Sequence, residues 1–398
     1  MNGEELRERI HREFPDGIYL DWACTSGIKA PGCAEAVYRA LCGTTSNINR
    51  GAYSKENQAG MNIFLLREQL RLFFDAPEDA VPVFTANVTQ ALDAAIRGSV
   101  GPEDHVIISG LEHHAVTRTL TEIGADYSVI PARQDGSADP EAFEALVRPE
   151  TKAVVLNHAS NISGTVNPVS GIFEKAGRHG LLRILDTAQS AGSLPVSMTK
   201  LNTDILCFTG HKGLLGPQGT GGMILTQETA DRLKPFLTGG TGSESAVYTM
   251  PEFLPDKFEA GTLNLPGLAG LKASLDWIGG QDLRKIHERE MDIAQKFASA
   301  AEALPGLSIA GGTDYSGERC PVVSVIFDEA AGDPSDAAAR LDEDYGIMTR
   351  SGLHCAPLAH KTLGSWPRGT VRFSFGPFTT PEEGRAATEA LAQIVNRT

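Results

Sequence analysis

The chain has 398 residues, of which 41% are hydrophobic and 21% charged, so it can bury an extensive core and is not globally disordered. Its formal net charge of −15 argues against a nucleic-acid-binding surface, because neutralising phosphates requires a basic face. The length predicts two or three domains.

The first residues, MNGEELRERIHREFPDG, are charged throughout and contain no apolar stretch typical of a secretory signal. No apolar run is long enough to predict a membrane span. The cysteines follow no metal-binding spacing and do not suggest a disulfide framework. They are Cys24, Cys33, Cys42, Cys207, Cys320 and Cys355. We therefore expect a cytoplasmic protein with reduced thiols and no bound metal, and we interpret Cys24, Cys33 and Cys42 as structural or incidental.

Between residues 81 and 225, short apolar strands alternate with segments of helical length. Buried strands are expected at HVIISG (105–110), KAVVLNH (152–158), LLRILD (181–186) and DILCFTG (204–210). Amphipathic segments such as 139–150 and 167–180 lie between them. This alternation predicts crossover units and a mostly parallel sheet covered on both faces.

After about residue 270 the pattern changes to a long helical stretch, followed by strand-like segments at 321–328 and 370–375 and a closing helix near 381–396. That order predicts a smaller α+β domain. We expect an N-terminal segment (1–18), a large domain (19–268) and a small C-terminal domain (269–398).

Polar residues end several of the expected strands, and the carboxyl ends of parallel strands meet at one crevice. Lys212 follows such a strand among glycines that let the backbone approach a ligand closely. An amine there could form a Schiff base if its pKa were lowered. Taken alone, a solvated loop lysine is the better interpretation.

Asp186 ends the strand LLRILD, where a partly buried carboxylate needs a cationic partner such as a protonated ring nitrogen. Gln189, three residues on, could donate a hydrogen bond to an oxygen on the same ring. The alternative interpretation of Asp186 is a helix N-cap.

Two further positions suit a planar anionic ligand. His113, just after the first buried strand, could stack on a ring or carry protons, although most histidines in that place do neither. Val88 and Thr89 lie where a strand becomes a helix, so their N–H groups would face an anion. An ordinary cap by Asn87 or Thr89 is the alternative.

Cys355 lies in RSGLHCAPLAH (350–360), a polar loop containing glycine that is a poor place to bury a thiol. Arg350 and His354 could stabilise its thiolate, so a reactive cysteine is at least as plausible as a structural one. A metal site here lacks further ligands.

Together these features resemble the class V, fold-type-I pyridoxal-phosphate (PLP) enzymes, and within them the cysteine desulfurases and selenocysteine lyases. The Asp–Ala–Gln and Gly–His–Lys pair indicates the superfamily, and the cysteine loop narrows it to this group. The matching motifs, spread over nearly the whole chain, are Tyr19–Thr25, Asn49–Gly51, Glu112–His114, Ser160–Thr165, Asp186–Gln189, Thr209–Lys212, Glu259–Thr262, Arg350–Ala356 and Arg372.

The resemblance implies an α/β fold, a homodimer with shared active sites, and bound PLP. Lys212 would bind the cofactor covalently and move the substrate's α-proton, with His113 on the ring face. The other implied cofactor contacts are Asp186 at the ring nitrogen, Gln189 at the ring oxygen, Asn161, and, around the phosphate, Val88, Thr89, Thr209, His211 and the partner's Thr262. The substrate carboxylate would be bound by Asn161, Arg350 and Arg372.

The implied reaction converts L-cysteine to L-alanine, leaving a persulfide on Cys355 for an acceptor protein. Selenocysteine lyase is the nearest alternative. A C–S lyase, aminotransferase or epimerase that does not use the thiol, and an inactive sulfur-relay scaffold, are the others. The chain departs from the family pattern at Trp22, Cys24, Tyr53, Asn87-Val88 and residues 356–371. The identity of the acceptor does not follow from the sequence.

Overall fold

The computed structural model describes residues 3–43, 48 and 54–396. Asn49-Arg50-Gly51 and Tyr53, named above from the sequence, lie outside the described residues. None of the helices in those ranges has the length and hydropathy needed to cross a membrane.

The large sheet has seven strands in the described part of the chain, in the order β2-β8-β7-β6-β5-β3-β4. Only β8 runs antiparallel to its neighbours, and the remaining pairs are parallel. The strands are β2 (Val81–Thr85), β3 (His105–Ile108), β4 (Asp126–Val129), β5 (Thr151–Asn157), β6 (Leu182–Asp186), β7 (Ile205–Thr209) and β8 (Gly221–Leu225). The predicted mostly parallel sheet is therefore confirmed.

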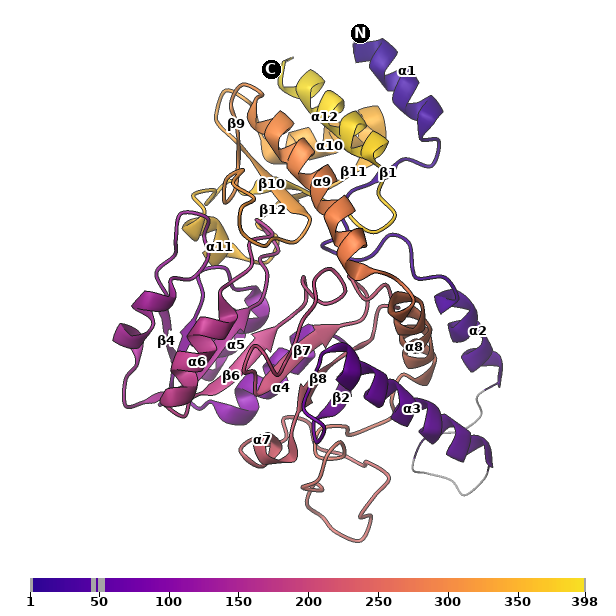
Figure 1. Cartoon of the computed structure of the whole chain (residues 1–398), viewed down its shortest axis with the longest axis vertical. Helices are drawn as coiled ribbons and strands as arrows, with labels where there is room; N and C mark the ends of the chain where they lie inside the picture. The colour runs from indigo at the N-terminus through magenta and orange to yellow at the C-terminus, as the bar shows by residue number, and fades with distance from the viewer. Residues whose placement is uncertain (1–2, 44–47, 49–53, 397–398) are drawn as a thin grey trace.

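Helices cover both faces of this sheet because its strands are buried on both sides. One core layer joins the sheet to α3 (Ser54–Phe73), α6 (Val169–Arg178) and α8 (Leu265–Gly279), with α2 (Cys33–Gly43) lying against α8. The opposite layer joins it to α4 (Val88–Ser99), α5 (His114–Ile123) and α7 (Gln227–Asp231). Figure 1 shows this large unit below a smaller one.

The smaller unit contains an antiparallel sheet in the order β12-β13-β10-β9. Its strands are β9 (Leu307–Ile309), β10 (Val322–Phe327), β12 (Arg350–Gly352) and β13 (Thr370–Ser374). Its helices are α9 (Leu283–Glu302), α10 (Pro334–Tyr345), α11 (Pro357–Thr362) and α12 (Pro381–Val395). The predicted C-terminal α+β arrangement is confirmed.

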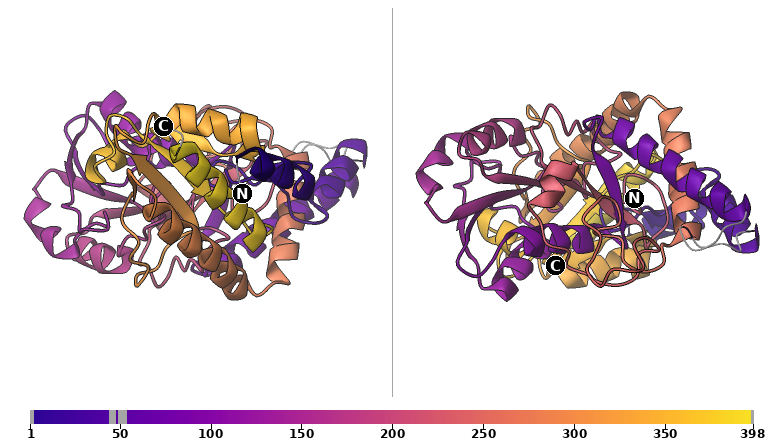
Figure 2. Two further views of the ribbon diagram at one scale, coloured as in Figure 1. Left: turned by 90° about the horizontal axis from the view of Figure 1, so that it is seen from above. Right: turned by 90° about the horizontal axis from the view of Figure 1, so that it is seen from below.

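The N-terminal end packs with this smaller unit. Helix α1 (Gly3–Glu13) lies against α10 and α12, as Figures 1 and 2 show. Strand β1 (Ile18–Tyr19) pairs in parallel with β11 (Ile347–Met348). Leu6, Ile10 and Ile18 are buried in the same core as the C-terminal helices.

The predicted domain limits stay a prediction, but packing changes from one core to the other between α8 and α9. One segment differs from expectation: 139–150 forms two short 3₁₀ turns, η1 (Pro140–Ala142) and η2 (Glu144–Leu146), instead of a helix. The backbone is already extended at Val147, and Pro149 favours an extended conformation at the residue before it, so no helix continues beyond Leu146.

Candidate active site

The strand ends do meet at one edge of the large sheet, as expected. Asn157, Asp186 and Thr209 end the adjacent strands β5, β6 and β7. Lys212 lies in the turn that follows β7. This turn approaches the one after β6 so closely that a Cβ on Gly213 would lie 2.4 Å from the carbonyl oxygen of Ala191. Glycine is therefore required where the two turns meet.

Lys212 is half-buried. Burial lowers its pKa to about 8, while the nearby Asp186 acts in the opposite direction and Arg372 adds to the lowering. Within the described residues, no side chain forms a hydrogen bond or an ion pair with the Nζ of Lys212. A substantial fraction of the amine is therefore neutral near physiological pH and available as a nucleophile.

Asp186 is buried, and its Oδ1 accepts a hydrogen bond from the Ala188 N–H at 2.8 Å. Burial raises the pKa of this carboxyl group and the Lys212 charge opposes the rise. Oδ2 receives no hydrogen bond from the described residues. The buried carboxylate thus fits the cationic ring nitrogen of a bound ligand.

His113 caps α5, since its Nδ1 accepts from the Ala115 N–H at 3.0 Å. Its proton therefore belongs on Nε2. Burial, followed by the charge of Lys212, lowers the pKa of His113 to about 3. The ring is neutral and half-buried beside the lysine, which suits contact with a planar cofactor.

The segment Trp22–Thr25 contacts two residues close to Lys212. Gln189 Nε2 donates to the Ala23 carbonyl at 3.0 Å, and His211 Nδ1 lies 3.1 Å from Thr25 Oγ1. Burial lowers the pKa of His211 to about 4, so this ring is neutral as well. A small cavity of about 40 Å³ is lined by Trp22, Gln189 and Lys212 among others.

The N-terminus of α4 supplies backbone donors. Asn87 caps the helix, its Oδ1 accepting from the Gln90 N–H at 3.0 Å, so the alternative cap interpretation is correct for Asn87. The first-turn N–H groups of Val88 and Thr89 have no intrahelical acceptors and can bind an anion as well.

Thr209, buried at the end of β7, donates to the Thr220 carbonyl at 3.4 Å. Thr262 lies exposed before α8, and its predicted role in the partner's site stays a prediction.

Two arginines face this edge from the small sheet, where Arg350 and Arg372 are register partners on β12 and β13. Arg372 is buried, its Nη2 lying 2.7 Å from Asp21 Oδ1 and its Nη1 donating to the Asn161 carbonyl at 3.2 Å. Asn161 Nδ2 donates to the His354 carbonyl at 2.9 Å. Asn161 and Arg372 are therefore brought together, and a substrate carboxylate would share Arg372 with Asp21.

The loop of Cys355 has an unusual backbone. His354 and Cys355 both have positive φ angles, 47° and 58°, which cost energy for residues other than glycine and are found at functional sites. The Cys355 carbonyl accepts from the His114 N–H at 2.8 Å, while its thiol is exposed and lies 3.8 Å from Arg350 Nη2. His354 does not assist this thiol, because its ring is buried and forms a hydrogen bond with Thr370. Burial also lowers the pKa of His354 to about 2, so the ring carries no charge.

One residue of the site was missed from the sequence. Cys24, interpreted from the sequence as structural or incidental, is half-buried, and its sulfur lies 3.6 Å from Arg350 Nη1. Its departure from the family pattern was the signal available, but the sequence does not reveal that Arg350 contacts it.

A comparison with protein-family models matches residues 18–385 to the class-V aminotransferases. This chain belongs to that family. A probable cysteine desulfurase from Methanothermobacter thermautotrophicus is 34% identical, over 97% of this chain and 98% of the relative. The cysteine desulfurase CsdA of Escherichia coli is 28% identical, over 100% of this chain and 98% of the relative.

Solved structures agree with the α/β fold of this class-V family member. The apo structure of a cysteine desulfurase from Thermococcus onnurineus has a TM-score of 0.87 at 29% identity, over 98% of both chains. CsdA of Escherichia coli has a TM-score of 0.84 at 25% identity, over 100% of this chain and 99% of that one.

Class-V aminotransferases are PLP-dependent enzymes, and the residues of this chain fit that cofactor. Among the described residues, the Lys212 amine has no partner and one Asp186 oxygen accepts no hydrogen bond, so these groups match an aldehyde and a cationic ring nitrogen. The neutral ring of His113 matches the face of the cofactor ring. The α4 N-terminus matches a phosphate.

Proposed function

We propose that this protein is a PLP-dependent cysteine desulfurase, which converts L-cysteine to L-alanine and keeps the sulfur as a persulfide on Cys355. The exposed thiol of Cys355, held beside Arg350 on a loop that packs against the His113 cap of α5, carries the proposal. The relatives also support it: they align with this chain over nearly their whole length, and they are named as a probable cysteine desulfurase and a cysteine desulfurase.

PLP, when bound, supplies an electron sink that makes the bonds at Cα and Cβ of an amino acid labile. Lys212 would hold the cofactor and move the α-proton at its Nζ, a task suited to an amine whose pKa is lowered to about 8. Asp186 would pair with the ring nitrogen and Gln189 with the ring oxygen. His113 would lie against the ring, and Val88, Thr89, Thr209 and His211 would surround the phosphate.

The substrate would be positioned from the small sheet. Arg372 and Arg350, with Asn161, form a cationic and amide-lined edge that suits a carboxylate, because a guanidinium binds both oxygens of such a group. Cys355 would then attack the substrate sulfur, forming a sulfur–sulfur bond while the carbon–sulfur bond breaks. The three-carbon remainder takes up a proton and leaves as alanine.

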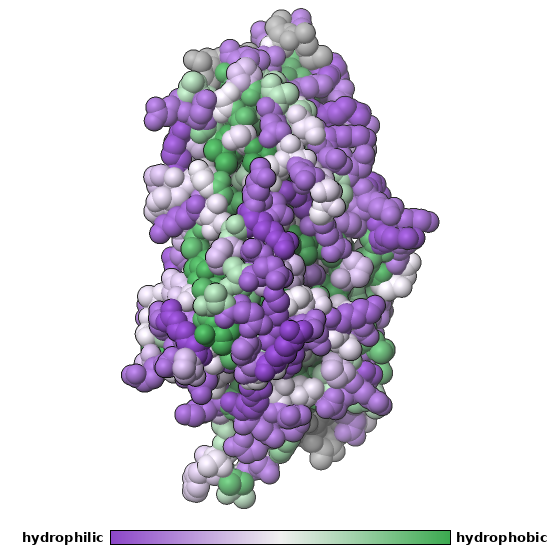
Figure 3. All heavy atoms as spheres, turned by 60° about the vertical axis from the view of Figure 1, so that its left-hand side comes forward, coloured by the Kyte–Doolittle hydropathy of each residue, from purple (hydrophilic) through white to green (hydrophobic). Residues whose placement is uncertain are grey.

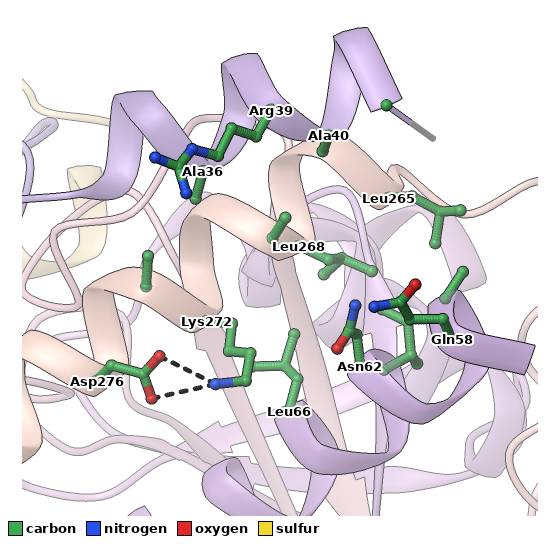
Figure 4. Close-up of a pocket in the computed structure, with 15 residues that line it drawn as sticks. Ala36, Arg39, Ala40, Gln58, Asn62, Leu66, Leu265, Leu268, Lys272 and Asp276 are labelled. Atoms are coloured by element: carbon green, nitrogen blue, oxygen red, sulfur yellow. Dashed lines mark hydrogen bonds and ion pairs between the residues drawn. The ribbon is translucent and has the colours of Figure 1, made fainter. Parts of the chain in front are cut away.

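A homodimer is part of this proposal, with Thr262 reaching the partner's phosphate site. A groove of about 690 Å³ between α2, α3 and α8 contains Leu66, Leu265 and Leu268, as Figure 4 shows. Large hydrophobic side chains are exposed on α2 and α3 beside it: Tyr38, Leu41, Met61, Phe64, Leu65 and Leu72. By contrast, most of the face in Figure 3 is hydrophilic. A second copy covering α2 and α3 would bury these side chains.

A protein sulfur acceptor and a cytoplasmic location stay predictions of the sequence.

The test is alanine production from L-cysteine and from L-selenocysteine, with and without a thiol reductant. Wild type should form alanine from L-cysteine. Cys355→Ala should lose at least roughly a hundredfold of that rate because the sulfur acceptor is missing. Cys42→Ala, which removes another exposed thiol, should behave as wild type.

Turnover of selenocysteine alone would replace the proposal with a selenocysteine lyase. Full activity of Cys355→Ala would exclude the persulfide role of this residue. Absence of alanine from both substrates, with PLP bound, would make the reactions that do not use the thiol the better candidates.

A further inference from the structure

A single guanidinium contacts two thiols at the mouth of the site. Arg350 Nη1 lies 3.6 Å from the sulfur of Cys24, and Arg350 Nη2 lies 3.8 Å from the sulfur of Cys355. The distance between the two sulfurs is therefore at most the sum of these two distances and the separation of the two terminal nitrogens of Arg350. The three residues come from distant parts of the sequence.

Cys24 is held in place by its neighbours on both sides. The Ala23 N–H donates to Ser374 Oγ at 2.9 Å, and the Ala23 carbonyl accepts from Gln189. On the other side, Thr25 Oγ1 donates to the His211 carbonyl at 3.1 Å. The Cys24 backbone is thus fixed between residues predicted to contact the cofactor.

The charges of the site agree with this position. Burial lowers the pKa of both Lys212 and Arg372, and for both groups Cys24 acts in the opposite direction. These effects agree with a Cys24 side chain that lies near both Lys212 and Arg372. Cys355, the other thiol that Arg350 contacts, is exposed.

We propose that Cys24 is a second sulfur carrier, which takes the outer sulfur of the persulfide formed on Cys355. This proposal rests on the proposed desulfurase function. The Cys24 thiolate attacks the outer sulfur, and a new sulfur–sulfur bond forms as the bond from that sulfur to Cys355 breaks. The Cys355 sulfur leaves with the electron pair and takes up, through solvent, the proton that Cys24 released. No electrons are gained or lost overall, so the step needs no oxidant.

Arg350 suits this exchange because its two terminal nitrogens can donate to both sulfurs at once and hold the negative charge as it moves. After the transfer, Cys355 is free to accept sulfur from another substrate, while the first sulfur rests on a half-buried residue. A chain without an acceptor should therefore store two sulfur atoms instead of one.

The holoenzyme is mixed with L-cysteine in the absence of reductant and oxygen, and the first burst of alanine is measured. The thiols are then alkylated and the peptides analysed by mass spectrometry. Wild type should release about two equivalents of alanine per chain and carry an extra sulfur on both Cys24 and Cys355. Cys24→Ala and Cys24→Ser should release about one equivalent and carry sulfur on Cys355 alone. Cys42→Ala should match wild type.

The possible failures can be told apart. If wild type releases about one equivalent and only Cys355 carries sulfur, the second carrier is wrong and the desulfurase function stands. If wild type releases no alanine, both proposals fall. Persulfide on Cys24 in the Cys355→Ala variant would show direct attack by Cys24 and overturn the transfer. An equal sulfur load on Cys42 in wild type would show unspecific exchange and also overturn it.

Discussion

The active site has two regions built in different ways. The cofactor floor consists of Lys212, Asp186 and His113, and the thiol rim consists of Cys24, Arg350 and Cys355. The floor lies at the ends of large-sheet strands and at the start of α5, where burial dominates the pKa shift of each group. The rim joins an N-terminal turn, the edge strand of the small sheet and a loop with positive φ angles.

This difference corresponds to a division of tasks. The floor is preorganised by burial and backbone hydrogen bonds, which suits the bond activation that PLP chemistry requires in any reaction. The rim is more accessible, and its two thiols are the groups that can accept sulfur. The reaction specificity of this protein is therefore expected to depend on the rim, and its basic catalytic power on the floor.

The sharpest test of the floor is Lys212→Ala. Removing the amine removes both covalent cofactor binding and the group that moves the α-proton, so alanine formation should fall by at least roughly a thousandfold. The characteristic absorbance of lysine-bound PLP should disappear, while the far-ultraviolet circular dichroism stays unchanged. Lys200→Ala, which removes an exposed lysine outside the site, is the matched control. Retention of activity by Lys212→Ala would remove the distinction between floor and rim.

At the rim, Arg350→Lys should reduce the transfer of sulfur to Cys24 while the cofactor stays bound. A lysine carries one point charge and cannot donate to two sulfurs from fixed positions, whereas the guanidinium does. The fraction of persulfide on Cys24, measured by mass spectrometry after turnover, should fall about tenfold, while PLP absorbance is retained. Arg385→Lys, at an exposed ion pair with Glu382, should change neither quantity. An unchanged Cys24 fraction in Arg350→Lys would mean that the guanidinium does not organise the rim.

The fold and the floor could be predicted from the sequence because their signals are local. Strands β5, β6 and β7 are mostly apolar segments, and the polar residue that ends each of them marks the functional edge of the sheet. Segment 139–150 was misleading because its apolar spacing resembles a helix, whereas the chain forms two short 3₁₀ turns there.

The rim could be predicted only in part. The loop composition marked Cys355, but the contact of Arg350 with Cys24 joins residues 326 positions apart, and no local pattern reports it. Similarly, the sequence indicated Arg372 as a carboxylate-binding residue without revealing that Asp21 pairs with it. Long-range pairs of this kind depend on how the N-terminal segment and the small sheet pack together.

The support beneath the floor should make stability depend on pH. Glu112 is fully buried, and its Oε1 accepts from Ser109 Oγ at 2.6 Å and from the Asn157 N–H at 2.9 Å. Burial raises the pKa of Glu112 from 4.5 to about 8, and the nearby Asp186 acts in the same direction. The folded protein therefore holds this proton between pH 4.5 and 8, where the unfolded chain releases it.

Because the folded state binds more protons in that range, the stability contributed by Glu112 is complete below pH 4.5 and is lost as the pH rises towards 8. Glu112→Gln cannot ionise and keeps an oxygen for both donors. Relative to wild type, it should therefore gain at least about 1 kcal/mol of stability between pH 5 and pH 8. Thermal unfolding midpoints of both proteins across this range provide the measurement.

The exposed Glu141→Gln is the matched control and should follow the wild-type curve. Cys355→Ala should follow it too, because a change at the exposed end of the rim leaves Glu112 buried. Parallel curves for wild type and Glu112→Gln would mean that Glu112 is already ionised in the folded protein. A second negative charge would then lie beside Asp186, and the floor would be less dependent on burial than its structure indicates.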